Sequence, residues 1–308
     1  MTDSPRRTSV VGDILVVAAY ELAQARRTRL LQVLVLGYAA ATGAAHWGFV
    51  QGLKEAERSI ALAMGVPPTD RPGAMIASVL SSEDLRRFIT NLIGSEALLE
   101  RLATVPVLAI WSGAVAMVLL PVFMLLGTSV SVAAEVENKS IRFLALRTER
   151  LPIILGKGLG QLAMASVAAL AGVAVTEVAG LTLMVQQPPL GLGLSALEHA
   201  ARALLYALPF AGLGLCVSQW VGRANPARAL GVIALIGVVI ANPWLEYQSS
   251  THALGRLADI VRTVLPGQGW TDMWQVNPVT FAVGAAKLLV VTLGWVALGY
   301  LRFDRRDL

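Results

Sequence analysis

The chain has 308 residues, of which 56% are hydrophobic and only 15% are charged, and its mean hydropathy is +0.65. A soluble domain is roughly 45–50% apolar and about 25% charged, so this excess of apolar residues cannot be hidden in a core of this size. The composition excludes a disordered protein, a collagen and a disulfide scaffold. It predicts an integral membrane protein with a formal net charge of +5, from 25 Lys and Arg against 20 Asp and Glu.

The N-terminal segment, residues 1–29, predicts a cytoplasmic amphipathic helix and not a signal peptide, because it lacks a compact apolar region before a cleavage site. At helical spacing Ile14 and Val17 share an apolar face, whereas Asp13 and Glu21 fall elsewhere. We expect this helix to lie in the membrane interface before the first span. A frayed cytosolic tail is the alternative.

Six stretches are long and apolar enough to cross a bilayer, which takes about 20 mostly apolar residues. The predicted fold class is therefore an all-α integral membrane protein with six transmembrane helices in a single transmembrane domain. An even number of spans places both termini on one side. The expected spans are residues 30–50, 105–134, 153–185, 196–221, 229–247 and 279–301.

The longer connections also carry helical patterns. Residues 51–104 predict an extracytoplasmic helical segment, with one helix over 53–64 and a second over 81–102 that starts at a capping-box-like Ser81 and Asp84. The other long extracytoplasmic loop is residues 248–278, with helical spacing between Leu254 and Val264. Residues 135–152 form a cytoplasmic loop and residues 302–308 a cytoplasmic tail.

The basic residues indicate the orientation. Short loops on the cytoplasmic side of a membrane protein carry an excess of Lys and Arg. If the N-terminus is cytoplasmic, 15 of the 25 Lys and Arg residues lie on the short inner segments, while the outer segments are longer and more balanced. The sequence therefore predicts a multi-pass protein with both termini in the cytoplasm.

Catalytic motifs are missing from the sequence. It contains no HExxH motif, no G-x-S-x-G nucleophile elbow and no cluster of His and Cys, since Cys216 is the only cysteine. Gly156-Lys157 does not belong to an ATP-binding P-loop, because Leu151 replaces the first glycine and Gly158 replaces the Ser or Thr that would hold magnesium. A nucleic-acid-binding surface is not expected either, because the distribution of the arginines is explained by their preference for the cytoplasmic side of a membrane.

Two charged residues inside the expected spans are candidates for a substrate path. An ionisable residue within a span is a functional candidate by default. Glu177 follows Lys157 by about 30 Å of helix, which places it near the outer interface as a solvated or Gln-paired acid. Lys287 lies a few residues into the last span from outside, where its side chain can extend to the interface.

The loop between the second and third spans combines charged and apolar residues in an unusual way. It begins with two acids one residue apart, Glu135 and Glu137, and Phe143 and Leu144 then alternate with arginines. We interpret this segment as a short amphipathic helix on the cytoplasmic surface. A loop whose arginines only enforce topology would explain the charges, but not the apolar pair or the double acid.

This loop resembles the corresponding segment of the permease subunits of ABC-2 type transporters. There an E-x-E pair precedes a short helix, and Gly-Lys opens the third span. Lys139-Ser140 replaces the Gly-Thr usual in the family. The tail 303–308 and Asn277-Pro278 before the last span are similar as well, and the group most alike is the permease of nitrous-oxide-reductase maturation systems. The loop positions that match are Glu135, Glu137, Ile141, Leu144, Arg150, Gly156 and Lys157.

The resemblance implies a transport subunit that is not itself an enzyme. It implies an exporter with the type V architecture, located in the inner membrane of a bacterium. It implies a homodimer with a substrate path between the two copies, and two separate ATP-binding subunits that hold ATP and Mg; this chain would bind no cofactor or metal. The loop would be the coupling helix that docks on the ATPase. The residues implied in coupling are Glu135, Glu137, Arg142, Phe143, Leu144, Arg147, Arg150 and Lys157.

Two other functions remain open from the sequence. One is a membrane subunit that transmits ATP-driven movement to an extracytoplasmic partner without transport, which the long outer segments allow. The other is an intramembrane enzyme, which would need polar groups that converge at membrane depth.

Overall fold

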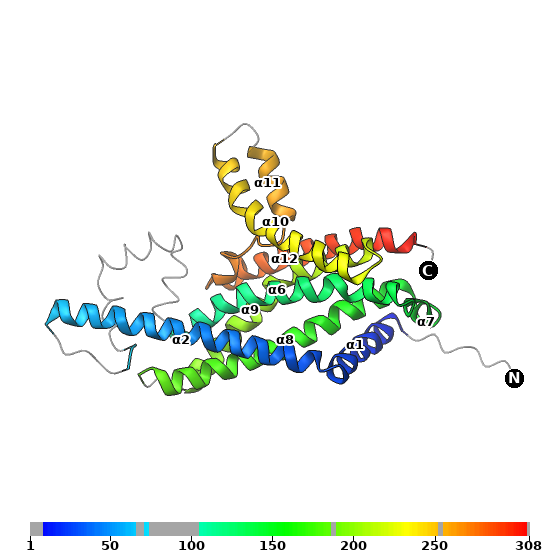
Figure 1. Cartoon of the computed structure of the whole chain (residues 1–308). Coiled ribbons are helices and arrows are strands. Elements are labelled where there is room, and N and C mark those ends of the chain that lie inside the picture. The colour runs from blue at the N-terminus through cyan, green and yellow to red at the C-terminus, as the bar shows by residue number, and fades with distance from the viewer. Residues whose placement is uncertain (1–8, 66–70, 74–104, 186–188, 252–254, 307–308) are drawn as a thin grey trace.

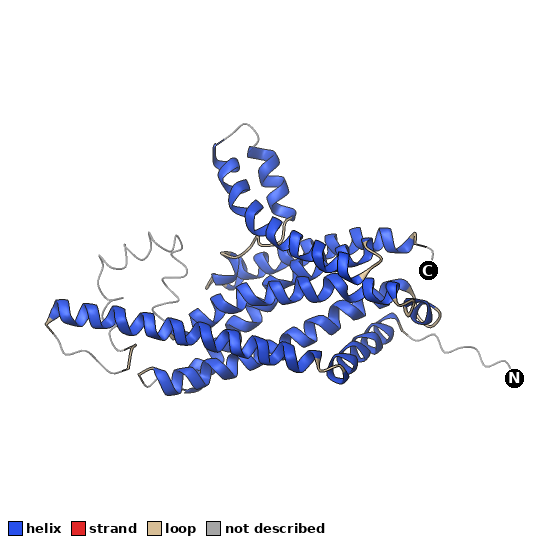
Figure 2. Ribbon diagram, viewed as in Figure 1, coloured by secondary structure: helices blue, strands red, loops and turns tan. Residues whose placement is uncertain are grey.

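The computed structural model describes residues 9–65, 71–73, 105–185, 189–251 and 255–306. Within these residues all regular structure is helical and no strand is present (Figure 2), which confirms the predicted all-α fold class. The helices are α1 (Val10–Arg27), α2 (Leu30–Met64), α6 (Val107–Glu137), α7 (Ile141–Ala145), α8 (Arg150–Leu183), α9 (Pro189–Trp220), α10 (Ala224–Thr251), α11 (Gly255–Val264), the 3₁₀ turn η1 (Asp272–Trp274) and α12 (Pro278–Asp304).

Six of the described helices are long and apolar enough to cross a membrane, namely α2, α6, α8, α9, α10 and α12. They run roughly along one axis, and the start of α1 and the end of α12 lie at the same end of the bundle as α7 (Figure 1). We call this the α7 end. The six spans expected from the sequence are confirmed, although most of the helices are longer than the stretches assigned to the bilayer.

The first span shows why helix and span differ in length. At 1.5 Å per residue α2 is about 52 Å long, against a hydrocarbon core of about 30 Å. Residues beyond position 50, such as Lys54 and Arg58, are good helix formers, so the helix continues to Met64. Gly65 then ends it in the left-handed conformation, with φ of 67°. The expected helix over 53–64 is thus the end of α2, while the one over 81–102 lies outside the described residues.

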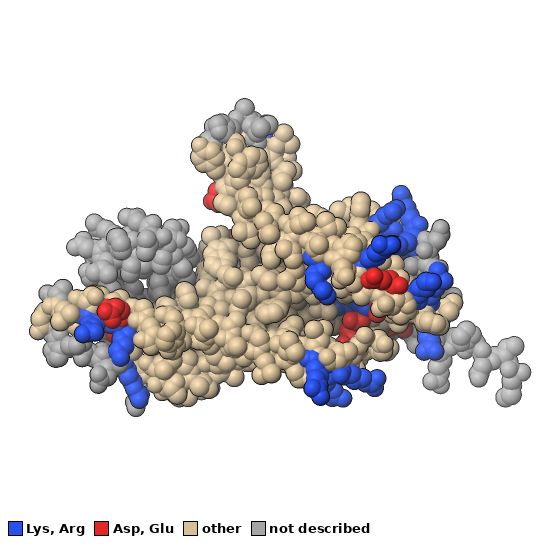
Figure 3. Space-filling model, in the orientation of Figure 1, with Lys and Arg blue, Asp and Glu red and all other residues tan. Residues whose placement is uncertain are grey.

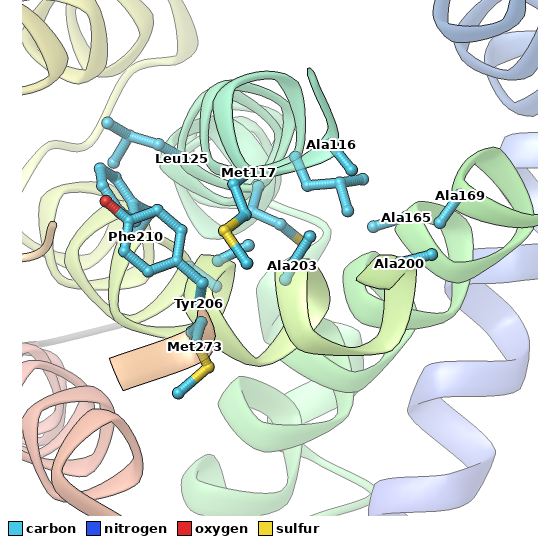
Figure 4. Packing of buried hydrophobic residues seen from close by; sticks show 14 of the residues in the cluster. Ala116, Met117, Leu125, Ala165, Ala169, Ala200, Ala203, Tyr206, Phe210 and Met273 are labelled. Carbon is cyan, nitrogen blue, oxygen red and sulfur yellow. The ribbon is translucent and has the colours of Figure 1, made fainter. Parts of the chain in front are cut away.

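The central pair of the bundle is α6 and α9, which bury the largest share of their surface. Alanines at positions 116, 200 and 203 bring the two backbones together, and Met117 and Phe210 fill the space beside them (Figure 4). Small residues favour close helix packing inside a membrane, where the lipid is as apolar as the side chains. The remaining spans pack around this pair, with α12 against α9 and α8 against α2.

The N-terminal helix α1 packs lengthwise against α8. Ser9 caps its start by accepting a hydrogen bond from the Gly12 N–H at 3.1 Å. The predicted apolar face, which includes the buried Val17, is turned towards α8, and Val11 and Val16 on the other side are exposed. Helix α1 therefore has two apolar sides, of which only the exposed one is available to the membrane.

Two glycines of α8 allow this contact. A Cβ at Gly156 would lie 2.5 Å from Cβ of Val17 and 2.8 Å from the carbonyl oxygen of Ile14, and one at Gly160 would lie 2.7 Å from Cβ of Glu21. Real Cβ atoms do not approach other atoms so closely, so only glycine permits this separation of the helix axes. The small residues of α8 at this end therefore serve packing within one copy of the chain.

We expect Gly156→Ala to destabilise the protein by about 1–3 kcal/mol, because the added methyl group must push α1 away from α8. Gly48→Ala in α2 is the matched control, since no atom lies within 4 Å of its added Cβ. The control should leave stability unchanged or raise it by up to about 1 kcal/mol through helix propensity. Thermal unfolding in detergent measures both, and equal Tm values for the two variants would contradict the close approach.

Candidate functional site at the α7 end of the bundle

The short helix α7 presents an exposed apolar pair to solvent. Phe143 is 73% exposed and Leu146 is 84% exposed. Residues three apart lie on one side of a helix, so these two form one face. Ile141 and Leu144 form the opposite face and pack against the cluster that contains Phe303. Of the apolar pair expected to dock, Phe143 and Leu144, only Phe143 points outward, and Leu146 takes the second place.

Basic side chains surround this face. Arg142 and Arg147 are both exposed on or beside α7. Figure 3 shows that Lys and Arg gather at the α7 end of the molecule, with a few acidic groups between them. An exposed apolar pair flanked by arginines is suited to a protein surface that offers an apolar pocket with acidic residues at its rim.

The most deeply buried charge of this region is Lys157, on α8. Its side chain is 1% exposed, and Nζ lies 2.5 Å from Oε1 of Glu21 and 2.7 Å from Oε1 of Glu135. The two carboxylates come from α1 and α6, so the ammonium group joins three helices. A buried charge is tolerated only when it is paired and hydrogen-bonded, and here both requirements are met.

Lys157 was expected to take part in coupling to the ATPase, and the structure places it inside the bundle. It touches α1 and α6 and is covered by them, so any influence on a docked partner acts through these helices. Glu21, which the helical pattern separated from the apolar face of α1, lies on the side of α1 that faces α8. No local sequence pattern indicates that Glu21 pairs with Lys157, because the two residues are 136 positions apart.

The two acids of the E-x-E pair have different partners. Residues two apart point to different sides of a helix. Glu135 points inward to Lys157, whereas Oε2 of Glu137 accepts a hydrogen bond from the N–H of Ala224 at 2.8 Å. Ala224 is the first residue of α10, and a carboxylate at a helix start satisfies a free N–H and complements the helix dipole. The pair therefore ties the end of α6 to α8 and α10.

Arg150, at the start of α8, binds the end of the last span. Its Nη1 donates to the carbonyl oxygens of Phe303 at 2.8 Å, Asp304 at 2.5 Å and Arg306 at 3.1 Å. These carbonyls lie at the C-terminal end of α12, and the last carbonyl oxygens of a helix have no hydrogen-bond partner within the helix. A cation at this end also complements the helix dipole. Arg150 is thus turned towards α12 and is less available to a partner than Arg142 and Arg147.

One further bond links the loop after α7 to α1, since the Thr148 hydroxyl donates to Oδ2 of Asp13 at 3.0 Å. The segment on both sides of α7 is therefore connected to the first helix, to the start of α10 and to the end of α12. A movement of α7 would act directly on these three elements.

The two residues suggested for a substrate path are not brought together. Glu177 is half-buried on α8, and its Oε2 has no hydrogen-bond partner among the described residues. The glutamines at 186 and 187 that could have paired with it lie outside the described residues. Lys287 is on α12 with a side chain that is 69% exposed, and Nζ lies 3.9 Å from Oδ2 of Asp272. The two residues belong to different helices and have different surroundings.

A buried polar chain, which the sequence did not predict, lies beside Glu177. Nε2 of His46 is 3.2 Å from Oγ1 of Thr176, and that oxygen is 2.8 Å from Oγ of Ser112. These residues come from α2, α8 and α6 and are buried. Hydrogen bonds between polar side chains join helices in a membrane. The feature of the sequence that could have indicated this chain is His46, a single histidine within an apolar span.

Within the described residues, no group of three or more His, Cys, Asp and Glu side chains is arranged to hold a metal ion. Cys216 is buried in α9.

We expect Lys157→Gln to destabilise the protein by about 3–5 kcal/mol, because it leaves two buried carboxylates without a cation. Lys139→Gln is the matched control, since Lys139 is exposed and its loss should change stability by no more than about 0.5 kcal/mol. Adding Glu21→Gln and Glu135→Gln to Lys157→Gln should recover part of the loss. Thermal unfolding of the purified proteins compares these three variants with the wild type, and a wild-type Tm for Lys157→Gln would show that the ion pairs contribute nothing.

Comparison with known proteins agrees with the bundle and the loop just described. The family model for "ABC-2 family transporter protein" matches residues 15–308. A search of curated proteins found no match. Members of this family are membrane subunits of transporters and work with ATP-binding subunits. The match covers all six spans, the loop with α7 and the C-terminal tail. The chain therefore belongs to the ABC-2 transporter family, as a multi-pass membrane permease.

Proposed function

We propose that the chain is the permease subunit of an ABC exporter, active as a homodimer with two ATP-binding subunits in the inner membrane of a bacterium. The α7 end faces the cytoplasm in this proposal, because it carries most of the basic residues of the short loops. Within the family, the loop and the tail favour the group that resembles the permease of nitrous-oxide-reductase maturation systems. ATP and Mg would be bound by the partner subunits.

The observation that carries the proposal is the exposed face of α7. Large apolar side chains exposed beside charged groups mark protein interaction sites. Phe143 and Leu146 lie at the end of the bundle that faces the ATP-binding subunits in this orientation, with Arg142 and Arg147 beside them. We propose that this face enters a groove of the ATPase and that the arginines pair with acidic groups there.

The contacts around α7 supply a route from the ATPase to the spans. When ATP binding closes the two ATPase subunits, α7 would move with the surface on which it is docked. The hydrogen bonds of Glu137, Thr148 and Arg150 would transfer this movement to α10, α1 and α12. The ion pairs of Lys157 would make α1, α6 and α8 move together at this end.

The docking face can be tested by the double variant Phe143→Ala with Leu146→Ala. We expect it to weaken association with the ATPase by at least about tenfold, because burial of each large apolar side chain contributes roughly 1.5–3 kcal/mol. Val11→Ala with Val16→Ala on the exposed side of α1 is the control, which should retain association. Co-isolation of the two subunits and the ATPase activity of the complex measure the effect. Full association and turnover in the α7 variant would exclude this face as the docking site.

The two arginines near α7 allow docking to be separated from stability. Arg147→Ala should lower association with the ATPase and leave the Tm of the isolated permease unchanged, because Arg147 is exposed. Arg150→Ala should lower the Tm, because three carbonyls at the end of α12 lose their donor. The reverse pattern, with a stability loss only in Arg147→Ala, would contradict the assigned roles.

A further inference from the structure

Three exposed arginines lie where α1 ends and α2 begins. We call residues 26–29 the elbow. Arg26 and Arg27 belong to the last turn of α1, and Arg29 directly precedes α2. Within the described residues none of the three takes part in an ion pair. In Figure 3 a group of basic side chains lies at the place where α1 meets α2 in Figure 1, with no acidic side chain among them.

The acids of α1 do not offset this charge, because they are turned towards the bundle. Asp13 accepts a hydrogen bond from Thr148, and Glu21 forms an ion pair with Lys157. After Glu21 the next acidic residue of the sequence is Glu55. The exposed side of the elbow therefore carries three positive charges without a nearby negative one.

Helix α2 indicates the depth of the elbow in the membrane. Residues 30–53 contain no Asp, Glu, Lys or Arg. Trp47 is 61% exposed on this stretch, and tryptophan favours the boundary between the hydrocarbon core and the headgroups. Trp47 lies 18 residues after Arg29, which is about 27 Å of helix against a core of about 30 Å. With Trp47 at one boundary, the elbow lies at the level of the headgroups on the other side.

Apolar side chains border the elbow on both helices. On α2, Leu30 and Val33 are exposed by 52% and 66%. On α1, Val16 and Tyr20 are exposed by 69% and 54%, and their spacing of four and seven residues places them on the same side as Arg27. A lipid whose acyl chains cover Leu30 and Val33 has its phosphate group beside the arginines.

A phospholipid with a net negative charge is the ligand that fits these facts. The guanidinium group donates two parallel hydrogen bonds to phosphate oxygens, which makes arginine well suited to phosphate recognition. An acidic protein surface would match the charge but not the lipid-facing side chains beside it. We infer that the elbow binds the headgroup phosphates of anionic phospholipids. The elbow then selects lipids by charge, in addition to holding α1 at the membrane surface.

Lipid binding to the full-length permease in neutral detergent tests this inference. Native mass spectrometry measures the affinity for phosphatidylglycerol, which is anionic, and for phosphatidylcholine, which is zwitterionic. The wild type should bind phosphatidylglycerol more tightly. The triple variant Arg26→Gln, Arg27→Gln and Arg29→Gln should lose about 100-fold in this affinity, because each basic residue near an anionic lipid surface contributes about fivefold. Its affinity for phosphatidylcholine should not change.

The matched control removes the same number of charges at the α7 end, by Lys139→Gln, Arg142→Gln and Arg147→Gln. These residues are exposed as well, so the control has the same net charge as the elbow variant. It should retain the affinity for phosphatidylglycerol. An equal loss in both triple variants would assign the effect to net charge and overturn the inference. Equal affinities of the wild type for the two lipids would overturn it as well.

A second measurement does not depend on the folding of the elbow variant. A benzophenone amino acid replaces Ala23, which is exposed one turn before the elbow, in the otherwise unchanged chain in native membranes. We expect photo-crosslinking to give an adduct with the mass of an anionic phospholipid. An adduct with another protein alone, or with zwitterionic lipids in proportion to their abundance, would contradict the assignment.

Discussion

The structure at the α7 end depends on the two ion pairs of Lys157. A single ammonium group, 1% exposed, lies between Glu21 of α1 and Glu135 of α6. Because a buried charge is stable only with its partners, the three helices cannot separate without exposing or orphaning a charge. The glycines at 156 and 160 on the same helix bring α1 close enough for these contacts. The ion pairs and the close packing therefore support each other.

This arrangement leaves α7 as the exposed element of a region that is otherwise bonded to its neighbours. The inner face of α7 is held by the cluster that contains Phe303, and the residues on both sides of it bind α1, α10 and α12. The outer face, with Phe143 and Leu146, has no such contacts within the described residues.

Burial is distributed unevenly among the spans. The central pair, α6 and α9, is largely covered by other helices, whereas α10 and α12 bury only a small part of their surface in one copy. Lipid accounts for the exposed apolar surface of these outer helices. Packing within a single copy thus holds the centre of the bundle together, and the outer spans present their apolar side chains to the bilayer.

The sequence by itself determined the fold class, the six spans and the amphipathic loop, because composition and helical periodicity are local properties of the chain. It also singled out Phe143, which is exposed, and Glu135, Glu137 and Lys157, which form the contacts between helices at the α7 end. Only the tertiary structure decided which groups meet. Lys157 and Glu21 are 136 positions apart, and Arg150 and Phe303 are 153 positions apart. The packing of α1 on α8 and of α12 beside α8 brings these pairs together, and no local pattern specifies that packing.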